Sequence, residues 1–98
     1  MTIRYGLLAT LVAKPGKGDD LANFLEKGRA LAAAEPDTAT WYAFKIDETT
    51  YGIFDTFETE DGRNAHINGE IPRALASVSS ELLARDAEIT PLGIVAVK

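Results

Sequence analysis

Apolar side chains occupy both the odd and the even positions of the first long hydrophobic stretch, residues 3–13. Strands with one face in water alternate apolar and polar residues, so this pattern predicts a strand that is covered on both faces. Residues 87–97 repeat the pattern near the other end of the chain, and Pro91 lies among them. Because proline cannot donate a ladder hydrogen bond, this last strand is predicted to lie at a sheet edge or to contain a bulge.

The middle of the chain predicts a β-hairpin. Residues 38–46, TATWYAFKI, and residues 51–57 are rich in β-branched and aromatic residues, which favour strands. The four residues between them, DETT, are polar and have a suitable length for a hairpin connection.

Two helical regions flank this hairpin. The first opens at the Asp-Asp pair at 19–20, whose carboxylates complement a helix N-terminus, and ends before Pro36. The second is predicted to form a short helix over residues 60–68 and a longer helix over residues 71–85. The Asn-Gly pair at 68–69 separates them, because these residues favour the backbone geometry of a helix end.

The predicted order is strand, helix, strand, strand, helix, strand. This is the split βαβ or ferredoxin-like arrangement, an α+β fold whose four-stranded antiparallel sheet carries its helices on one face. The length of 98 residues predicts a single domain over residues 1–98. The helices leave the second sheet face open although its residues are apolar, which predicts a homodimer with the two sheets packed face to face.

Composition and charge exclude several classes of partner and site. The net charge is −5 and the ten basic residues are scattered, so neither a nucleic acid nor an anionic membrane surface is expected as a partner. The chain has no cysteine, which excludes disulfides, thiolate catalysis and cysteine-ligated metals. The uncharged run at residues 5–13 is too short to span a bilayer, and a cytoplasmic location is expected.

His66 is the only histidine and the first candidate for proton chemistry, because its ordinary pKa lies near neutrality. Asp55 lies in an otherwise apolar strand, where a carboxylate needs a partner, and His66 is a plausible one. These two residues are the candidate catalytic pair. The alternatives are a structural histidine at the helix–sheet junction and an aspartate on a half-solvated strand.

Six of the aromatic residues cluster on the hairpin and could line a slot for a planar apolar ligand. Ordinary core and dimer packing is the alternative. Trp41 is the preferred pocket residue, because an indole can both stack and donate a hydrogen bond. Arg63 could bind an anionic or carbonyl group. The candidate substrate-binding residues are Trp41, Tyr51, Phe54, Phe57 and Arg63.

The chain resembles the antibiotic biosynthesis monooxygenase superfamily of small dimeric α+β barrel proteins. The resemblance lies in a first strand that runs into ATLVAKPGKGDDL, in EPDTATWYAF and in YGIFDTFETEDGRNAHINGE, and it covers nearly the whole chain. It implies a pocket between the sheet and the helices of each subunit. Active members of that family include oxygenases of quinols and polycyclic aromatic molecules that use neither metal nor flavin, so no cofactor and no metal are expected. Other members degrade haem or isomerise small metabolites.

The chain also departs from the pattern of that family. Many members end the third strand with Glu-x-Trp and carry an Ala-x-x-x-His-Leu-like helix; here Asp55, Phe57 and His66 stand at the Glu, Trp and His positions. Oxygenase-like members often have a second histidine about five residues later, where this chain has Ile71. The haem-degrading members use an asparagine where this chain has Ala9, so haem is not expected.

The resemblance and the lone histidine lead to the hypothesis of a cofactor-independent monooxygenase that acts on a small quinol-like or aromatic molecule, with His66 as the base. The absent second histidine and the presence of Phe57 favour an alternative, a non-catalytic dimeric module that binds a small apolar ligand or serves a stress response. A third hypothesis is an isomerase of a small metabolite, in which His66 shuttles a proton without oxygen.

Overall fold

The computed structural model describes residues 2–98, and its architecture is the predicted α+β ferredoxin-like fold. The four strands form one antiparallel sheet in the order β2-β3-β1-β4. The elements are β1 (Tyr5–Val12), α1 (Gly18–Ala33), β2 (Thr38–Lys45), β3 (Thr50–Phe57), α2 (Glu60–Ile67), α3 (Glu70–Leu82) and β4 (Glu88–Gly93).

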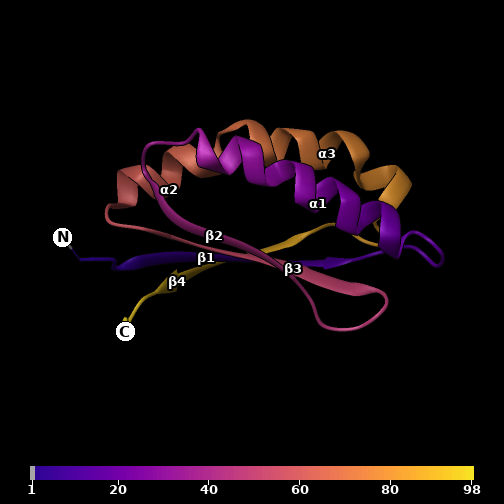
Figure 1. Ribbon diagram of the computed structural model, residues 1–98, viewed down its shortest axis with the longest axis horizontal. Coiled ribbons are helices and arrows are strands. Elements are labelled where there is room, and N and C mark those ends of the chain that lie inside the picture. Colours follow the sequence, from indigo (N-terminus) through magenta and orange to yellow (C-terminus); the bar gives the residue numbers. More distant parts are fainter. Residues whose placement is uncertain (1) are drawn as a thin grey trace.

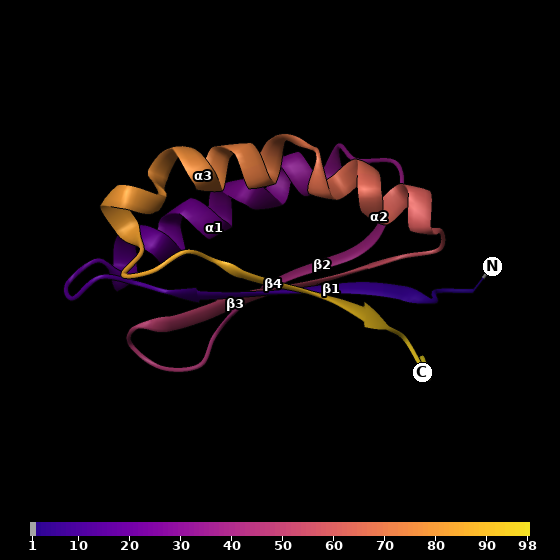
Figure 2. The same cartoon turned by 180° about the vertical axis from the view of Figure 1, so that it is seen from behind.

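The helices all lie on one face of the sheet, and the opposite face carries no element of the described chain (Figure 1). The view from behind shows the same two layers, with α1 and α3 side by side over one end of the sheet and α2 over the other (Figure 2). The sheet end beneath α2 is also the end at which both chain termini lie. This two-layer arrangement buries one face of the sheet and leaves the other open.

The strand register decides which residues face the helices. Leu7 pairs with Asp55, and Asp55 pairs with Trp41 on the other side, so these three side chains share the helix-facing side. One residue earlier, Phe54 pairs with Leu8 and faces the opposite, open side. Along β3 the inward residues are therefore Tyr51, Ile53, Asp55 and Phe57.

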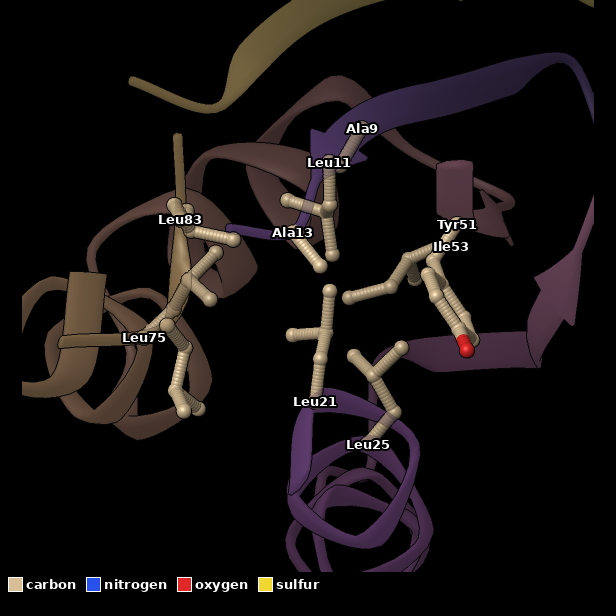
Figure 3. Packing of buried hydrophobic residues seen from close by; sticks show 10 residues of the cluster. Ala9, Leu11, Ala13, Leu21, Leu25, Tyr51, Ile53, Leu75 and Leu83 are labelled. Atoms are coloured by element: carbon tan, nitrogen blue, oxygen red, sulfur yellow. The ribbon is translucent and has the colours of Figure 1, made fainter. Parts of the chain in front are cut away.

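The apolar core fills the space between the sheet and the two longer helices. Leu21 of α1 points toward Leu11 of β1, Leu25 points toward Ile53 and Tyr51 of β3, and Leu75 and Leu83 close the other side (Figure 3). Leu11 and Leu21 are completely removed from solvent. Apolar area buried in this way is the main stabilising term for a small domain.

The helix boundaries follow local chemistry. The Thr59 hydroxyl accepts a hydrogen bond from the Gly62 backbone N–H at 3.0 Å, which caps the N-terminus of α2. The helical region breaks after Ile67 and resumes at Glu70, as the Asn-Gly pair predicted. The second part ends at Leu82, three residues before the predicted end, because Leu83 adopts an extended backbone.

The last strand lies at a sheet edge, as Pro91 predicted. It is shorter than predicted, since the ladder to β1 ends at Gly93. The open sheet face carries apolar side chains, among them Leu8, Tyr42 and Phe54, together with threonines such as Thr40 and Thr56. Phe44 lies across Gly52 there, where a side chain on Gly52 would collide with the Phe44 ring. Within residues 2–98, none of the helices combines the length and the hydrophobicity that a membrane crossing requires.

Candidate functional site

Asp55 and His66 approach each other because β3 runs directly into α2. Asp55 is an inward residue of β3, and a turn of only two residues separates that strand from the helix. His66 lies in the last turn of α2 on the side that faces the sheet. Asp55 is 1% exposed and His66 is 5% exposed, so both polar groups are withdrawn from bulk water.

The His66 ring lies between two carboxylates. Its Nδ1 donates a hydrogen bond to Glu35 Oε1 at 2.7 Å, and its Nε2 lies 2.8 Å from Asp55 Oδ2. Glu35 follows the C-terminus of α1, so three separate parts of the chain meet at this ring. The same Glu35 oxygen accepts a second hydrogen bond, from Thr38 Oγ1 at 2.7 Å.

These carboxylates favour the protonated imidazolium. Burial of His66 opposes the charged form and by itself would lower the pKa of the ring. The contacts with Asp55 and Glu35 outweigh burial and raise the pKa of His66 above its ordinary value of 6.5. A doubly protonated ring donates at both nitrogens and has no free lone pair, so in this state His66 cannot accept a proton.

The Asp55 carboxylate is close to His66 but incompletely satisfied. The 2.8 Å separation suits a hydrogen bond, but the N–H is not aligned with Asp55 Oδ2, and the contact is therefore a close ion pair. Among residues 2–98, Asp55 Oδ1 has no hydrogen-bond donor either. A buried carboxylate oxygen without a donor is costly, and it is the type of group that a bound molecule can satisfy.

Asp55 and His66 lie in the wall of a cavity with a volume of about 80 Å³. Apart from these two, its lining is apolar and comes from both layers of the fold. Ile67 and Ile89 are 38% and 48% exposed, so the cavity opens to the surface between the helices and β4. The other lining residues are Leu7, Ala9, Ile53, Ile71, Pro72 and Leu75.

The three ionisable residues of this site do not form a metal centre. Glu35 and Asp55 approach opposite nitrogens of His66, so their oxygens do not converge on a common point. Across residues 2–98, no group of three histidine, aspartate or glutamate side chains is arranged to hold a metal ion. The arrangement is suited instead to moving or holding a proton next to an apolar ligand.

Three of the predicted pocket aromatics lie outside this cavity. Phe54 is on the open face of the sheet, because it precedes the inward-facing Asp55 by one residue. Tyr51 is inward but four residues away, where it packs in the core beside α1. Trp41 faces the helices but packs against Gly28 and lines a separate surface groove. Phe54, Tyr51 and Trp41 therefore do not line the Asp55–His66 cavity.

Phe57 and Arg63 lie near His66 but outside the cavity. Phe57 is completely buried, with its ring centroid 5.4 Å from that of His66, so it packs against the imidazole without lining the cavity. Arg63 Nη1 donates to the carbonyl oxygens of Gly6 at 3.3 Å and Leu92 at 3.2 Å. These bonds attach α2 to the sheet, and Arg63 does not reach the cavity.

Sequence reasoning missed Glu35 altogether. Its position before Pro36 marked the end of a helix, and α1 does end two residues earlier, at Ala33; but 31 residues separate Glu35 from His66. No local periodicity connects residues at that distance. The available signal was Thr38, three residues later, whose hydroxyl is hydrogen-bonded to Glu35. Two polar residues close together at the end of a helix suggest that they share a hydrogen-bond partner elsewhere in the chain.

Comparisons with known proteins place the chain among structures of the same fold. No family model and no curated protein matches it. The crystal structure of NE2512, a protein of unknown function from Nitrosomonas europaea, is 40% identical, with 98% of this chain and 93% of that chain covered and a TM-score of 0.96. A candidate antibiotic biosynthesis monooxygenase from Nitrosomonas europaea is 13% identical, with coverage of 94% and 99% and a TM-score of 0.83. A second such candidate, from Caulobacter crescentus CB15, is 20% identical, with coverage of 96% and 92% and a TM-score of 0.81.

Proposed function

The chain belongs to one family with NE2512 and has the fold of the antibiotic biosynthesis monooxygenases, and on this basis we propose that it is an oxygenase of a small quinol-like or aromatic molecule. The observation that carries the proposal is the Asp55–His66 ion pair in the wall of an otherwise apolar cavity. The apolar lining would hold the ring of the substrate. The buried charges would act on its oxygen substituent.

In this proposal Asp55 accepts the proton and His66 supplies positive charge. Asp55 Oδ1 is buried and has no donor among residues 2–98, so a substrate hydroxyl that reaches it could donate to it and then transfer its proton. The substrate anion that remains would be stabilised by the adjacent imidazolium. This assignment differs from a base role for His66, because each ring nitrogen already lies within 2.8 Å of a carboxylate oxygen.

The chemistry balances without a further reductant. The substrate anion would pass electrons to dioxygen, and one oxygen atom would form a new bond to the ring carbon. The hydrogen of that ring carbon and the proton already lost by the substrate hydroxyl would leave with the second oxygen atom as water, so the substrate is oxidised to a quinone-like carbonyl. The protein would contribute the apolar enclosure, the proton acceptor and the positive charge.

Oxygen uptake tests the proposal. Wild-type protein is offered a panel of dihydroxynaphthalenes and anthrones, beside the variants Asp55→Asn and His66→Gln. The exposed Asp86→Asn is the matched control for the change in charge. We expect uptake with at least one substrate, reduced at least about 100-fold in both site variants and unchanged in Asp86→Asn. No uptake with any substrate, or equal uptake in all four proteins, contradicts the proposal.

The size of the cavity favours a second candidate, proton transfer within a small metabolite. A volume of about 80 Å³ is below the roughly 150 Å³ of a cavity that binds benzene. An isomerase would use the same two residues without consuming oxygen. Anaerobic incubation with small hydroxycarbonyl compounds in D₂O distinguishes the two, because an isomerase exchanges substrate C–H for C–D when no oxygen is present.

We also propose that a second copy of the chain covers the open sheet face. Tyr42 is 59% exposed there, beside Phe54 and Leu8. Aromatic and aliphatic groups exposed together on one surface are typical of an interface. Light scattering after size-exclusion chromatography is expected to give twice the 10.6 kDa chain mass, and Tyr42→Glu is expected to favour the monomer. A wild-type monomer at micromolar concentration contradicts this part of the proposal.

A further inference from the structure

We propose that Glu35 is a positioning residue of the site: its carboxylate fixes the orientation of the His66 ring beside Asp55. The juxtaposition of a buried imidazole with a carboxylate on each side carries this inference. It rests on the proposed function in one respect, namely that a charged His66 acts on the ligand in the cavity.

The geometry around Glu35 is that of a fixed group. Oε1 accepts from His66 Nδ1 and from Thr38 Oγ1, each at 2.7 Å, so two donors hold one oxygen in place. The Glu35 backbone is also fixed, because its N–H donates to the Ala32 carbonyl at the end of α1 at 3.1 Å. A charge-assisted hydrogen bond to an anchored carboxylate selects one orientation of the ring.

Among the charged residues near His66, Glu35 is the one placed to orient the ring. Asp55 from β3 is the other carboxylate in contact, and its approach to Nε2 is poorly aligned. Arg63 on the same helix is turned toward the carbonyls of β1 and β4, not toward the ring. Phe57 of β3 packs against the ring, and the cavity residues that β1, α2 and α3 contribute beside it are apolar: Leu7, Ile67, Ile71 and Leu75.

Glu35 also connects the site to water on a different side of the molecule from the cavity. It is partly exposed and lines a polar surface groove of about 330 Å³ with Thr38 and Trp41, whereas Asp55 and His66 line the apolar cavity. A proton on His66 Nδ1 can move to Glu35 Oε1 and from there to water in the groove. The charge on His66 can therefore equilibrate with solvent while a ligand fills the cavity.

The single histidine makes a direct test available. Its ring resonances are unambiguous in a proton–nitrogen NMR spectrum, and their midpoint of titration is followed in ligand-free wild type, Glu35→Gln and Thr38→Val. The exposed Glu81→Gln is the matched control for the loss of one carboxylate. We expect Glu35→Gln to lower the midpoint by at least about one pH unit. Thr38→Val should lower it less, and Glu81→Gln should not change it.

Equal midpoints in wild type, Glu35→Gln and Glu81→Gln overturn the inference. Thr38→Val keeps the Glu35 carboxylate and serves as the second test if Glu35→Gln does not fold. If Thr38→Val shows the wild-type titration midpoint and the wild-type Nδ1–H signal, the inference is overturned as well. The titration needs no substrate, so its failure is separate from failure of the oxygen-uptake assay. Where oxygen uptake is measurable, kcat should fall as the pH rises. This fall should occur at a lower pH in Glu35→Gln than in wild type, with little change in KM.

Discussion

The space between the helices and the sheet has two ends that differ in chemistry, although the same strand lines both. At the core end, Tyr51 of β3 faces Leu21 and Leu25 of α1 in a hydrophobic cluster. At the site end, β3 presents Asp55 to a buried histidine. One alternating strand thus supplies a stabilising surface at one end and a charged one at the other.

The helices explain why the two ends differ. The core end is covered by α1, with 16 residues, and by α3, with 13 residues. The site end is covered by the eight-residue α2, and the cavity lies beneath its junction with α3. Ile67 ends α2, and Ile71 and Pro72 belong to the first turn of α3. The comparison teaches that the cavity forms where continuous helix packing is interrupted, and that polar groups accompany it.

The largest expected effect comes from the core end. Leu11→Ala should destabilise the domain by about 2–5 kcal/mol, because Leu11 is completely buried and its neighbours cannot fill the space. Leu7→Ala, on the same strand and face, should cost less, since Leu7 already borders the cavity. Urea unfolding at one fixed protein concentration measures both losses of stability. Val95→Ala is the control, because the Val95 side chain is 99% exposed. A greater loss for Leu7→Ala would mean that the site end is the tighter packed of the two.

At the site end, Asp55→Asn should destabilise the domain by about 1.5–3 kcal/mol at pH 6, because a charged partner of His66 is lost. The loss should shrink at high pH, where His66 is neutral in both proteins. A double-mutant cycle with His66→Gln isolates the pair, and Asp86→Asn controls for net charge. A coupling energy of zero would show that the 2.8 Å contact contributes nothing to stability.

The outcome at these residues shows what the sequence could and could not predict. The contact between Asp55 and His66 was predictable because strand and helix are consecutive and the alternation of β3 places Asp55 inward. The same alternation excludes Phe54 from that side, although composition alone grouped it with the pocket. Glu35 reaches the ring only through tertiary packing across 31 residues, which no local pattern encodes.

The pH dependence of stability should distinguish the two ends again. The pKa of His66 is raised in the folded state, so the native protein binds this proton more tightly than the unfolded chain does. The stabilisation is complete below pH 6.5 and is lost as the pH rises through the folded-state pKa of His66. Each pH unit between the unfolded-state and folded-state pKa values of His66 reduces the free energy of unfolding by about 1.4 kcal/mol. Thermal unfolding from pH 5.5 to 9 measures the loss.

The control for that profile is His66→Gln, which should be flatter over this range because it removes the titrating group. Leu11→Ala should lower the whole curve without changing its shape, since the core end contains no titrating partner of His66. A wild-type curve that rises over the same range would contradict the retention of a proton by the folded state.

The smallest expected effect concerns the cap that begins α2. Thr59→Ala removes the acceptor for the Gly62 N–H and should cost about 1 kcal/mol. Thr59→Ser keeps the hydroxyl and should cost less, which makes it the matched control. Because α2 carries His66, loosening its first turn should broaden the His66 NMR signal while the core remains protected from hydrogen exchange. Equal loss of protection at Leu11 and at His66 would instead show that the two ends unfold as one unit.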